Sequence, residues 1–225
     1  MPLNKLEILL AGGSGGLGSA TSSLLQSEGA QVHIASRSAG IHFDITSRAD
    51  RARVLSAVPL IHGLVVFTGT PARASAGIST EETMRLSHEI NYQGPILLAR
   101  AAAEQMKQNG IPGSIVLLST MQAVALFPGS TIYAGAKAAL QHSALILAKE
   151  CRAANIRVNV IAPGITAAGM AQASIASGKY NRYISDGIIP RFGHALDVAR
   201  AVRLFLEPDN YITGQILSVD GGITL

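Results

Sequence analysis

Residues 6–18, with the sequence LEILLAGGSGGLG, join an apolar run to a glycine-rich loop. Glycine lets the backbone turn sharply and approach a pyrophosphate closely, and the N-terminus of a following helix offers free N–H groups to an anion. A tight strand–helix turn that binds nothing is the alternative. The loop lies between a first predicted strand and a first predicted helix, where dinucleotide loops occur, and this favours binding. The residues expected to contact the dinucleotide here are Gly12, Ser14, Gly16, Leu17 and Gly18.

Outward from this loop, short apolar runs alternate with longer amphipathic stretches. The predicted strands are Leu6–Ala11, Val32–Ser36, Ile41–Phe43, Gly63–Thr68, Ser114–Ser119, Arg157–Ala162 and Ile216–Val219. The predicted helices are Gly18–Glu28, Ser47–Ala57, one from near Ser79 through Asn91, Tyr133–Ala154 and Asp197–Leu206. Pro95 either bends the helix that begins near Ser79 or starts a new helix, which ends near Asn109–Gly110. Repeated strand–helix alternation implies right-handed crossovers and a parallel sheet covered on both faces. The sequence therefore predicts an α/β fold, a doubly wound parallel sheet of the Rossmann type, in a single domain over residues 1–225.

The composition narrows the classes of function. Hydrophobic residues make up 48% of the 225 residues and charged residues 14%, which fits a packed domain and excludes a disordered chain. The net charge of +4 comes from scattered basic residues, and the near-cluster Arg48, Arg51 and Arg53 has no interleaved aromatic residues, so no nucleic-acid surface is expected. The six histidines show no metal-ligand spacing, so no metal site is expected.

The cysteine count and the apolar runs bear on the compartment. Cys151 is the only cysteine, so it cannot form an internal disulfide and the chain fits a reducing compartment. The N-terminus shows no signal peptide, and no apolar run approaches the length of a membrane span. We expect a soluble, cytoplasmic protein without a membrane partner.

The second predicted strand ends in Ala35-Ser36-Arg37-Ser38. In dinucleotide-binding folds an acid near this point bonds the adenosine ribose and selects NAD, whereas an arginine accommodates the 2′-phosphate of NADP. Ser36 is not acidic, and the guanidinium of Arg37 can hold a phosphate bidentately. A solvated surface arginine is the alternative. We expect NADP, with NAD less favoured, and contacts from Ser36, Arg37 and Ser38.

A set of motifs follows in chain order: Ala11-Gly12…Gly16-Leu17-Gly18, Asn91, Tyr133-x-x-x-Lys137, Asn159…Pro163-Gly164 and Tyr211-Ile212-Thr213-Gly214-Gln215…Asp220-Gly221-Gly222. This set resembles the short-chain dehydrogenases/reductases, above all the single-domain branch that includes the 3-oxoacyl-carrier-protein reductases. A Tyr-x-x-x-Lys spacing alone occurs by chance, but the ordered set is highly specific and covers nearly the whole chain. The resemblance implies a cofactor site that continues over Asp44, Ile45, Thr68, Gly69, Tyr133, Lys137, Pro163, Gly164, Ile165 and Thr166.

The sequence also departs from the family pattern. The departures are Ala11 for threonine, Val66-Phe67-Thr68-Gly69 for Asn-Asn-Ala-Gly, Thr120 for the catalytic serine, Ala168 for the threonine after Pro163-Gly164, and only six residues between Arg37 and Asp44. Thr120 keeps the hydroxyl, and Ser119 one step earlier is the alternative. Thr166 lies two residues before Ala168, so the sequence does not decide which residue holds the nicotinamide carboxamide. Relatives place a whole helix in the six-residue segment, so the helix after the second strand is expected to be shortened or missing.

The residues suggest carbonyl reduction, which adds a hydride to carbon and a proton to oxygen. A free phenol has a pKa of about 10, and a nearby ammonium lowers it. Tyr133 and Lys137 are four residues apart on one predicted helix and share a face. The hydroxyl of Thr120, or of Ser119, would polarise the carbonyl. The resemblance implies that Lys137 also bonds the nicotinamide ribose and that Asn91 holds a water for proton relay.

Each of these candidate residues has a plainer explanation. Tyr133 could be an interfacial core tyrosine, Lys137 a surface lysine, Thr120 a turn residue, and Asn91 a helix C-terminal residue. The ordered set of motifs favours the functional interpretation. We therefore expect hydride transfer between NADP(H) and a carbonyl or alcohol substrate. A non-catalytic cofactor-binding sensor or scaffold is the alternative, and a nucleotide-sugar epimerase or dehydratase is a third, less favoured because such enzymes usually carry a larger C-terminal domain.

Two further expectations concern the substrate and the assembly. Residues 165–192 are expected to form a substrate lid lined by Met170, Ala171, Ala173, Ile175, Tyr180, Tyr183 and Ile188. Such a lining fits a hydrophobic or modest-sized carbonyl; a highly charged one fits poorly unless Lys179, Arg182 or Arg191 faces inward. The stretch Ala134–Ala148 is apolar on most sides, which favours a helix that also packs on a second subunit. We expect a homo-oligomer, a tetramer or a dimer.

Overall fold

The computed structural model describes residues 3–72 and 79–225. Within these residues lies a seven-stranded sheet whose neighbouring strands all pair in parallel, in the order β3-β2-β1-β4-β5-β6-β7. The strands are β1 (Glu7–Ala11), β2 (Gln31–Ser36), β3 (Ile41–His42), β4 (Gly63–Val66), β5 (Ser114–Leu118), β6 (Arg157–Pro163) and β7 (Ile216–Val219). This confirms the predicted doubly wound sheet.

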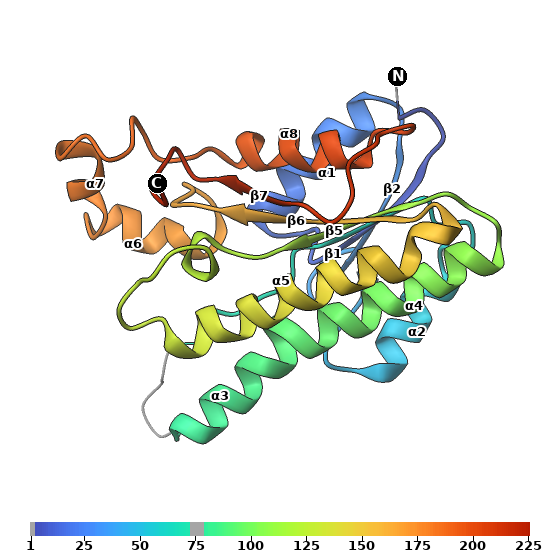
Figure 1. Ribbon diagram of the computed structural model, residues 1–225, viewed down its shortest axis with the longest axis horizontal. Coiled ribbons are helices and arrows are strands. Elements are labelled where there is room, and N and C mark those ends of the chain that lie inside the picture. Colours follow the sequence, from blue (N-terminus) through green and yellow to red (C-terminus); the bar gives the residue numbers. More distant parts are fainter. Residues whose placement is uncertain (1–2, 73–78) are drawn as a thin grey trace.

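Helices cover both faces of the sheet (Figure 1). They are α1 (Gly16–Ser27), α2 (Arg48–Ser56), α3 (Thr80–His88), α4 (Gly94–Gln108), α5 (Thr131–Cys151), α6 (Gln172–Ala176), α7 (Asn181–Ser185) and α8 (Ala195–Leu206). Helices α1 and α8 pack on one face, and α2, α4 and α5 on the other. None of the helices in the described part of the chain is both long and apolar enough to cross a membrane.

Both faces of each central strand are apolar because each face meets its own core. In β1, Ile8 and Leu10 join the core beneath α1 and α8, whereas Leu9 and Ala11 join the core beneath α4 and α5. Alternate side chains of a strand point to opposite faces, so a strand buried on both sides is a continuous apolar run.

The strand order reverses between β1 and β4, and the carboxyl ends of all strands lie at one edge. A crevice forms at such a reversal in open α/β sheets, and ligands bind there. This edge therefore determines where a site can be built.

The connection from β2 to β3 contains only residues 37–40, which confirms the missing helix. The Ser36 hydroxyl accepts hydrogen bonds from the backbone N–H groups of Ser38 (3.2 Å) and Ala39 (2.8 Å) and donates to the Ala39 carbonyl (2.7 Å). One side chain thus holds the short turn together. A compact turn at the cleft edge therefore stands in place of the helix that follows the second strand in relatives.

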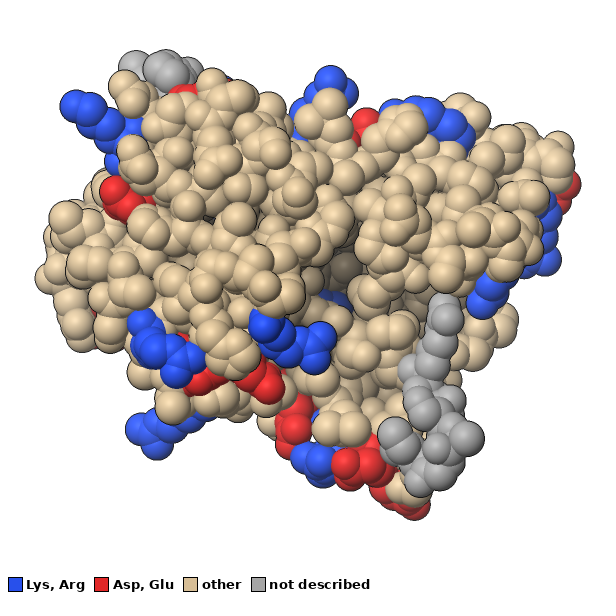
Figure 2. Space-filling model, turned by 180° about the vertical axis from the view of Figure 1, so that it is seen from behind, with Lys and Arg blue, Asp and Glu red and all other residues tan. Residues whose placement is uncertain are grey.

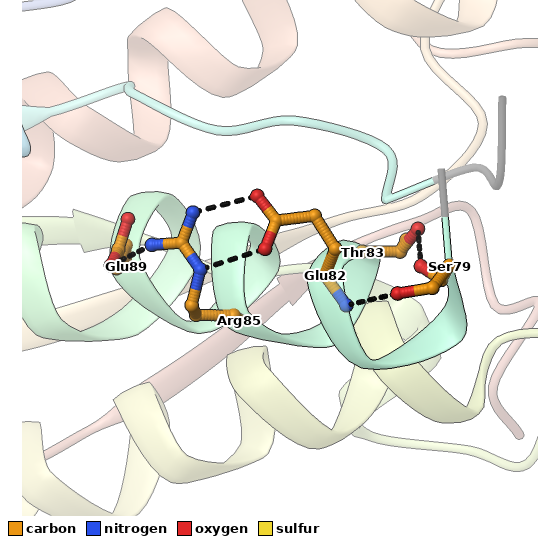
Figure 3. Close-up of polar contacts among 5 residues, drawn as sticks. All are labelled: Ser79, Glu82, Thr83, Arg85 and Glu89. Atoms are coloured by element: carbon orange, nitrogen blue, oxygen red, sulfur yellow. Dashed lines mark hydrogen bonds and ion pairs between the residues drawn. The ribbon is translucent and has the colours of Figure 1, made fainter. Parts of the chain in front are cut away.

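Helices α3 and α4 are joined by a π-helical segment, Glu89–Gln93. The side chain of Ser79 caps α3 by accepting a hydrogen bond from the backbone of Glu82 (3.2 Å). Arg85 bonds both carboxylate oxygens of Glu82 (2.7 and 2.9 Å) and one oxygen of Glu89 (2.6 Å), so it ties α3 to the π-helical segment (Figure 3). The expected bend near Pro95 is therefore a π-helical segment just before α4, whose first turn contains Pro95.

Other boundaries agree with the sequence to within a few residues. Ser47 caps α2 by accepting from the Asp50 backbone. The helix predicted over Tyr133–Ala154 begins at Thr131 and ends at Cys151, followed by a 3₁₀ turn over Arg152–Ala154.

Candidate active site

A cleft of about 1820 Å³ runs along the carboxyl edge of the sheet. Its walls come from the turns after β1, β2, β4, β5 and β6, from the start of α5, and from the segment that carries α6 and α7. Figure 2 shows the molecule hollowed between the lobe that carries α6 and α7 and the rest of the fold. The cleft brings most of the residues predicted for cofactor binding together with Ser119, Thr120 and Tyr133 of the predicted catalytic residues.

All the predicted cofactor residues except Lys137 line this cleft, as do Thr120 and Ser119. Lys137 and Asn91 lie behind its wall. Both side chains approach the same point, because a β-carbon built on Gly69 would lie 3.2 Å from Asn91 Oδ1 and 3.7 Å from Lys137 Nζ. Gly69 therefore forms a thin part of the wall over two buried polar groups.

The glycine loop is shaped by close backbone contacts. Gly12 has a φ of +83°, and a β-carbon there would lie 3.0 Å from the backbone nitrogen of Thr68. A β-carbon on Gly18 would lie 2.6 Å from the Cα of Gly13, so α1 packs directly on the turn before it. These contacts bring the N-terminus of α1 to the cleft, where its free N–H groups suit a phosphate.

The β2–β3 turn faces the glycine loop across the cleft. The hydroxyls of Ser14 and Ser38 are 3.2 Å apart and join the two turns. Arg37 is exposed beside them and forms no salt bridge with a described acid. Ser36 also lines the cleft, but its hydroxyl is engaged in the β2–β3 turn. The cationic group available at this end is therefore Arg37.

Asp44 and Ile45 continue this end of the cleft. Asp44 Oδ1 accepts hydrogen bonds from the backbone (2.9 Å) and hydroxyl (2.8 Å) of Thr46. Ile45 is buried and lies against α4, where a β-carbon on Gly94 would come within 2.7 Å of it. The pair forms a fixed edge with one polar and one apolar side chain.

Thr120 and Tyr133 are two hydroxyl-bearing residues that line the cleft. Thr120 follows β5 and its hydroxyl accepts from the backbone of Gln122 (3.3 Å). The same hydroxyl interacts with the phenol of Tyr133, which lies in the first turn of α5, and lowers its pKa. Burial raises the pKa of Tyr133 to about 12, and the interaction with Thr120 acts in the opposite direction.

Ser119 points away from Tyr133. Its hydroxyl accepts from Gln141 Nε2 (3.0 Å) and approaches the backbone carbonyl of Lys137 (3.5 Å). The geometry therefore places Thr120 beside the phenol and uses Ser119 to join β5 to α5. Gln141 escaped the sequence interpretation, although its position one turn after Lys137 was a signal that it shares the same buried face.

Lys137 is 3% exposed, and its Nζ donates to the backbone carbonyl of Leu118 at 2.7 Å. Burial lowers the pKa of Lys137 to about 7 because the charged form is poorly solvated there. In the cofactor-free protein, Lys137 is not among the groups that lower the pKa of Tyr133. Desolvation of the phenol dominates, and the interaction that opposes it comes from Thr120.

Asn91 sits in the π-helical segment and is fully buried. Its Oδ1 accepts from the backbone of Thr70 (2.9 Å), and its Nδ2 donates to the carbonyl of Thr70 (3.0 Å) and to the hydroxyl of Ser87 (3.0 Å). A π-helical turn reorients side chains and occurs often at functional sites. Here it aims Asn91 at the turn after β4, so the asparagine fixes the segment that the altered Val66–Gly69 motif leaves without side-chain bonds.

Two threonines of the cleft wall differ in how their hydroxyls are satisfied. Thr166 is buried, and its hydroxyl donates to the carbonyl of Gly164 at 3.3 Å. The hydroxyl oxygen of Thr68 is buried with no hydrogen-bond partner among the described residues. An unsatisfied buried hydroxyl destabilises a fold, so the Thr68 hydroxyl lowers the stability of this wall in the cofactor-free protein.

The segment after β6 contributes to the cleft wall, but the residues that line the cleft differ from the predicted ones. Met170, Ala171, Tyr180 and Tyr183 line the cleft, and so do Lys179 and Arg182. Ala173, Ile175 and Ile188 do not, because Ile175 packs behind the lid and the other two are exposed to solvent. Arg191 is turned away from the cleft and paired with Asp197 (2.7 Å).

Comparison with known proteins gives one family match and close relatives. A family model described as "Enoyl-(Acyl carrier protein) reductase" matches residues 26–224. The chain is 32% identical over 243 residues to "Carbonyl reductase family member 4" of Danio rerio, covering 99% of each chain.

Two solved structures are similar in fold and sequence. One, described as "short chain dehydrogenase/reductase family protein", has a TM-score of 0.87 and 29% identity, covering 100% of both chains. The other, "Crystal structure of a small-chain dehydrogenase in complex with NADPH", has a TM-score of 0.84 and 29% identity, covering 98% of this chain and 99% of that one.

Proposed function

The chain belongs to the short-chain dehydrogenase/reductase family of oxidoreductases, and from this premise we propose that it reduces a carbonyl compound, or oxidises the matching alcohol, with NADP(H). The observation that carries the proposal is that Thr120 and Tyr133 both line the cleft and that the Thr120 hydroxyl acts on the pKa of the phenol, with Lys137 buried behind them. Two hydroxyls side by side can act on one substrate oxygen.

The residues of the cleft fit NADP(H). The N-terminus of α1, after a loop that packs too closely at Gly12 and Gly18 for side chains, would hold the pyrophosphate. Arg37 would hold the 2′-phosphate, because it lies at the cleft beside Ser14 and Ser38 with no acid paired to it.

The rest of the cleft would hold the remaining parts of the cofactor. Asp44 and Ile45 would hold the adenosine end, with Thr68 and Gly69 along the wall. The segment from Pro163 to Thr166 would hold the nicotinamide end. The bound cofactor supplies or accepts the hydride.

In reduction, Thr120 donates a hydrogen bond to the substrate carbonyl oxygen and polarises it. Tyr133 transfers its phenolic proton to the same oxygen. With a pKa of about 12 the phenol is fully protonated at neutral pH, so the proton is available. Microscopic reversibility makes the phenolate the base in oxidation.

Lys137 restores the proton that Tyr133 gives up. Its pKa of about 7 means that the amine gains or loses a proton with little change in free energy near neutral pH. When protonated, it stabilises the phenolate by charge. Asn91 holds the neighbouring wall in place through Thr70, and we propose that it also orients a water for the relay.

We further propose that the enzyme works as a homo-oligomer in the cytoplasm. The apolar side chains of Leu97 on α4 and Ile146 on α5 are about half exposed on the outer face of the fold, which suits a subunit contact. The single cysteine, Cys151, suits a reducing compartment. Light scattering at micromolar concentration would test the assembly, and a monomer mass would contradict it.

The test of the activity is NADPH oxidation with a panel of ketones and aldehydes, together with dissociation constants for NADPH and NADH. The parent should bind NADPH more tightly, and Arg37→Ala should weaken NADPH binding about tenfold or more while leaving NADH nearly unchanged. Equal affinities in the parent would contradict the NADP assignment. Tight NADPH binding without turnover of any carbonyl would instead favour a non-catalytic cofactor-binding protein.

A further inference from the structure

The charges on the cleft wall are not balanced. Among the described lining residues the acids are Asp44 and Glu89, and the bases are Arg37, Lys179 and Arg182. Glu89 is paired with Arg85, whereas Asp44 keeps its charge and accepts hydrogen bonds from Thr46. The cations are not paired in this way, so an anionic ligand would meet unbalanced positive charge.

The two cations of the lid lie far along the chain from Arg37, which is assigned to the cofactor. Lys179 and Arg182 form no salt bridge with any carboxylate in the described part of the chain. Asp186, one turn further along, acts on Arg182 by charge but is exposed and does not line the cleft. Basic side chains lie along the outer edge of the lobe of α6 and α7 (Figure 2).

Each of the two cations lies against an aromatic ring, although both side chains are exposed. Lys179 Nζ lies 5.6 Å from the ring centre of Tyr180, and the guanidinium of Arg182 lies 5.2 Å from that of Tyr183. Cation–π contacts of this length limit the side-chain conformations and remove water from one side of each charge. An anion that approaches from the cleft would then meet two cations with much of their conformational freedom already reduced.

The same rings connect the cations to the reactive hydroxyls. Tyr180 and Tyr183 pack in an apolar cluster with Met121, which directly follows Thr120, and with Phe127, which precedes α5. The cleft wall therefore changes from hydroxyls at Thr120 to aromatic and apolar surface and then to cations at the lid.

We propose that Lys179 and Arg182 form an anion subsite and that the substrate is a carbonyl compound with an apolar body and a carboxylate or phosphate group. This inference rests on the proposed carbonyl reduction. The carbonyl lies at Thr120, the apolar body lies along the Tyr180–Tyr183 surface, and the anionic group reaches the two cations of the lid.

Binding of simple probes tests the subsite without requiring turnover. Isothermal titration of the NADPH-loaded protein with octanoate and with its neutral analogue octanamide should show octanoate binding about tenfold or more tighter, as expected for charge-assisted bonds. In the double variant Lys179→Gln/Arg182→Gln this preference should fall below about threefold. The control Lys107→Gln/Arg200→Gln removes the same charges from exposed sites outside the cleft and should keep the preference. Equal binding of the two probes by the parent, or a preference that survives in the double variant, would overturn the subsite.

Two further arms identify the anion and separate the two hypotheses. Octyl phosphate that binds more tightly than octanoate indicates a phosphate substrate, and weaker binding indicates a carboxylate. Turnover of 8-oxononanoate should exceed that of its methyl ester in kcat/KM by about tenfold in the parent only. Reduction of neutral ketones without any preference for anions sinks the subsite alone. A preserved octanoate preference without turnover of any carbonyl supports the subsite and sinks the reductase function.

Discussion

The two ends of the cleft are stabilised by different kinds of contact. Next to β1, the glycine loop is shaped by main-chain atoms so close that Gly12 and Gly18 have no room for a side chain. Next to β5 and α5, the wall depends on buried polar side chains with defined partners, such as Lys137 on the carbonyl of Leu118. Substitutions that add atoms should therefore be most harmful in the glycine loop next to β1. Substitutions that remove polar groups should be most harmful next to β5 and α5.

The largest expected effect comes from a substitution at the end of the cleft next to β5 and α5. Tyr133→Phe keeps the ring and removes the ionisable hydroxyl, so turnover should fall by about 10²–10⁴-fold while the NADPH dissociation constant changes by less than about twofold. Steady-state kinetics and NADPH titration measure the two effects. Tyr211→Phe, at a fully exposed tyrosine, is the matched control and should change neither. Full activity in Tyr133→Phe would remove this residue from the mechanism.

Substitutions of Thr120 and Ser119 test which of the two neighbouring hydroxyls takes part in catalysis. Thr120→Ala should lower kcat more than Ser119→Ala, because Thr120 contacts the phenol and Ser119 bonds Gln141 instead. Ser119→Ala should mainly lower stability, since it leaves the buried Gln141 amide without this acceptor. The reverse order of kcat values would move the polarising role to Ser119.

The buried lysine makes stability depend on pH. The pKa of Lys137 falls from 10.5 to about 7 on folding, so between these values the unfolded chain binds one more proton than the folded one. Stability of the cofactor-free protein should therefore rise with pH, by about 1.4 kcal/mol per pH unit from this group. Relative to Lys137→Met, the parent should gain stability steadily from pH 7 to pH 10 in urea denaturation. A difference between the parent and Lys137→Met that stays constant with pH would contradict the burial of the charge. Lys149→Met, at an exposed lysine, is the control: the difference in stability between the parent and this variant should not change with pH.

Two helical glycines compare the ends directly. In Gly18→Ala the new β-carbon would lie 2.6 Å from Gly13, and we expect a loss of about 1–3 kcal/mol together with weaker NADPH binding. In Gly135→Ala, in α5, the new β-carbon meets nothing within 4 Å, and we expect a gain of about 0.5–1 kcal/mol from helix propensity. Chemical denaturation of both variants measures the contrast. Similar effects of the two substitutions would show that close packing does not distinguish α1 from α5.

The smallest expected effect concerns the unsatisfied hydroxyl of Thr68. Thr68→Val replaces it with a methyl group of similar size and should stabilise the cofactor-free protein by about 1 kcal/mol. The matched change Thr83→Val removes a hydroxyl that donates to the Ser79 carbonyl (2.9 Å, Figure 3) and should destabilise by a similar amount. Melting temperatures of the two variants should thus move in opposite directions. A lower melting temperature for Thr68→Val would mean that the hydroxyl is satisfied in solution.

Sequence patterns with a local cause predicted the structure well. The alternation of apolar runs and amphipathic stretches depends on burial of each element's own face, and the strands and most helices appear where it placed them. Ser47 and the six residues between Arg37 and Asp44 likewise act through neighbours in the chain, so the cap of α2 and the missing helix were both predictable. The π-helical segment was not, because its Asn91 bonds Thr70, a residue distant from it in the chain.

The sequence by itself therefore determined the doubly wound sheet, the family, and the set of residues that meet at the cleft. It could order Thr120 and Ser119 only by family spacing, with Ser119 left open, and it misjudged which residues of the lid face inward. It also did not show that burial raises the pKa of Tyr133 in the cofactor-free protein. That quantity depends on how completely α5 and its surroundings exclude water, and on whether the ammonium of Lys137 points to the phenol or to the carbonyl of Leu118. Desolvation and side-chain direction arise from residues distant in the chain, so only the tertiary structure decided them.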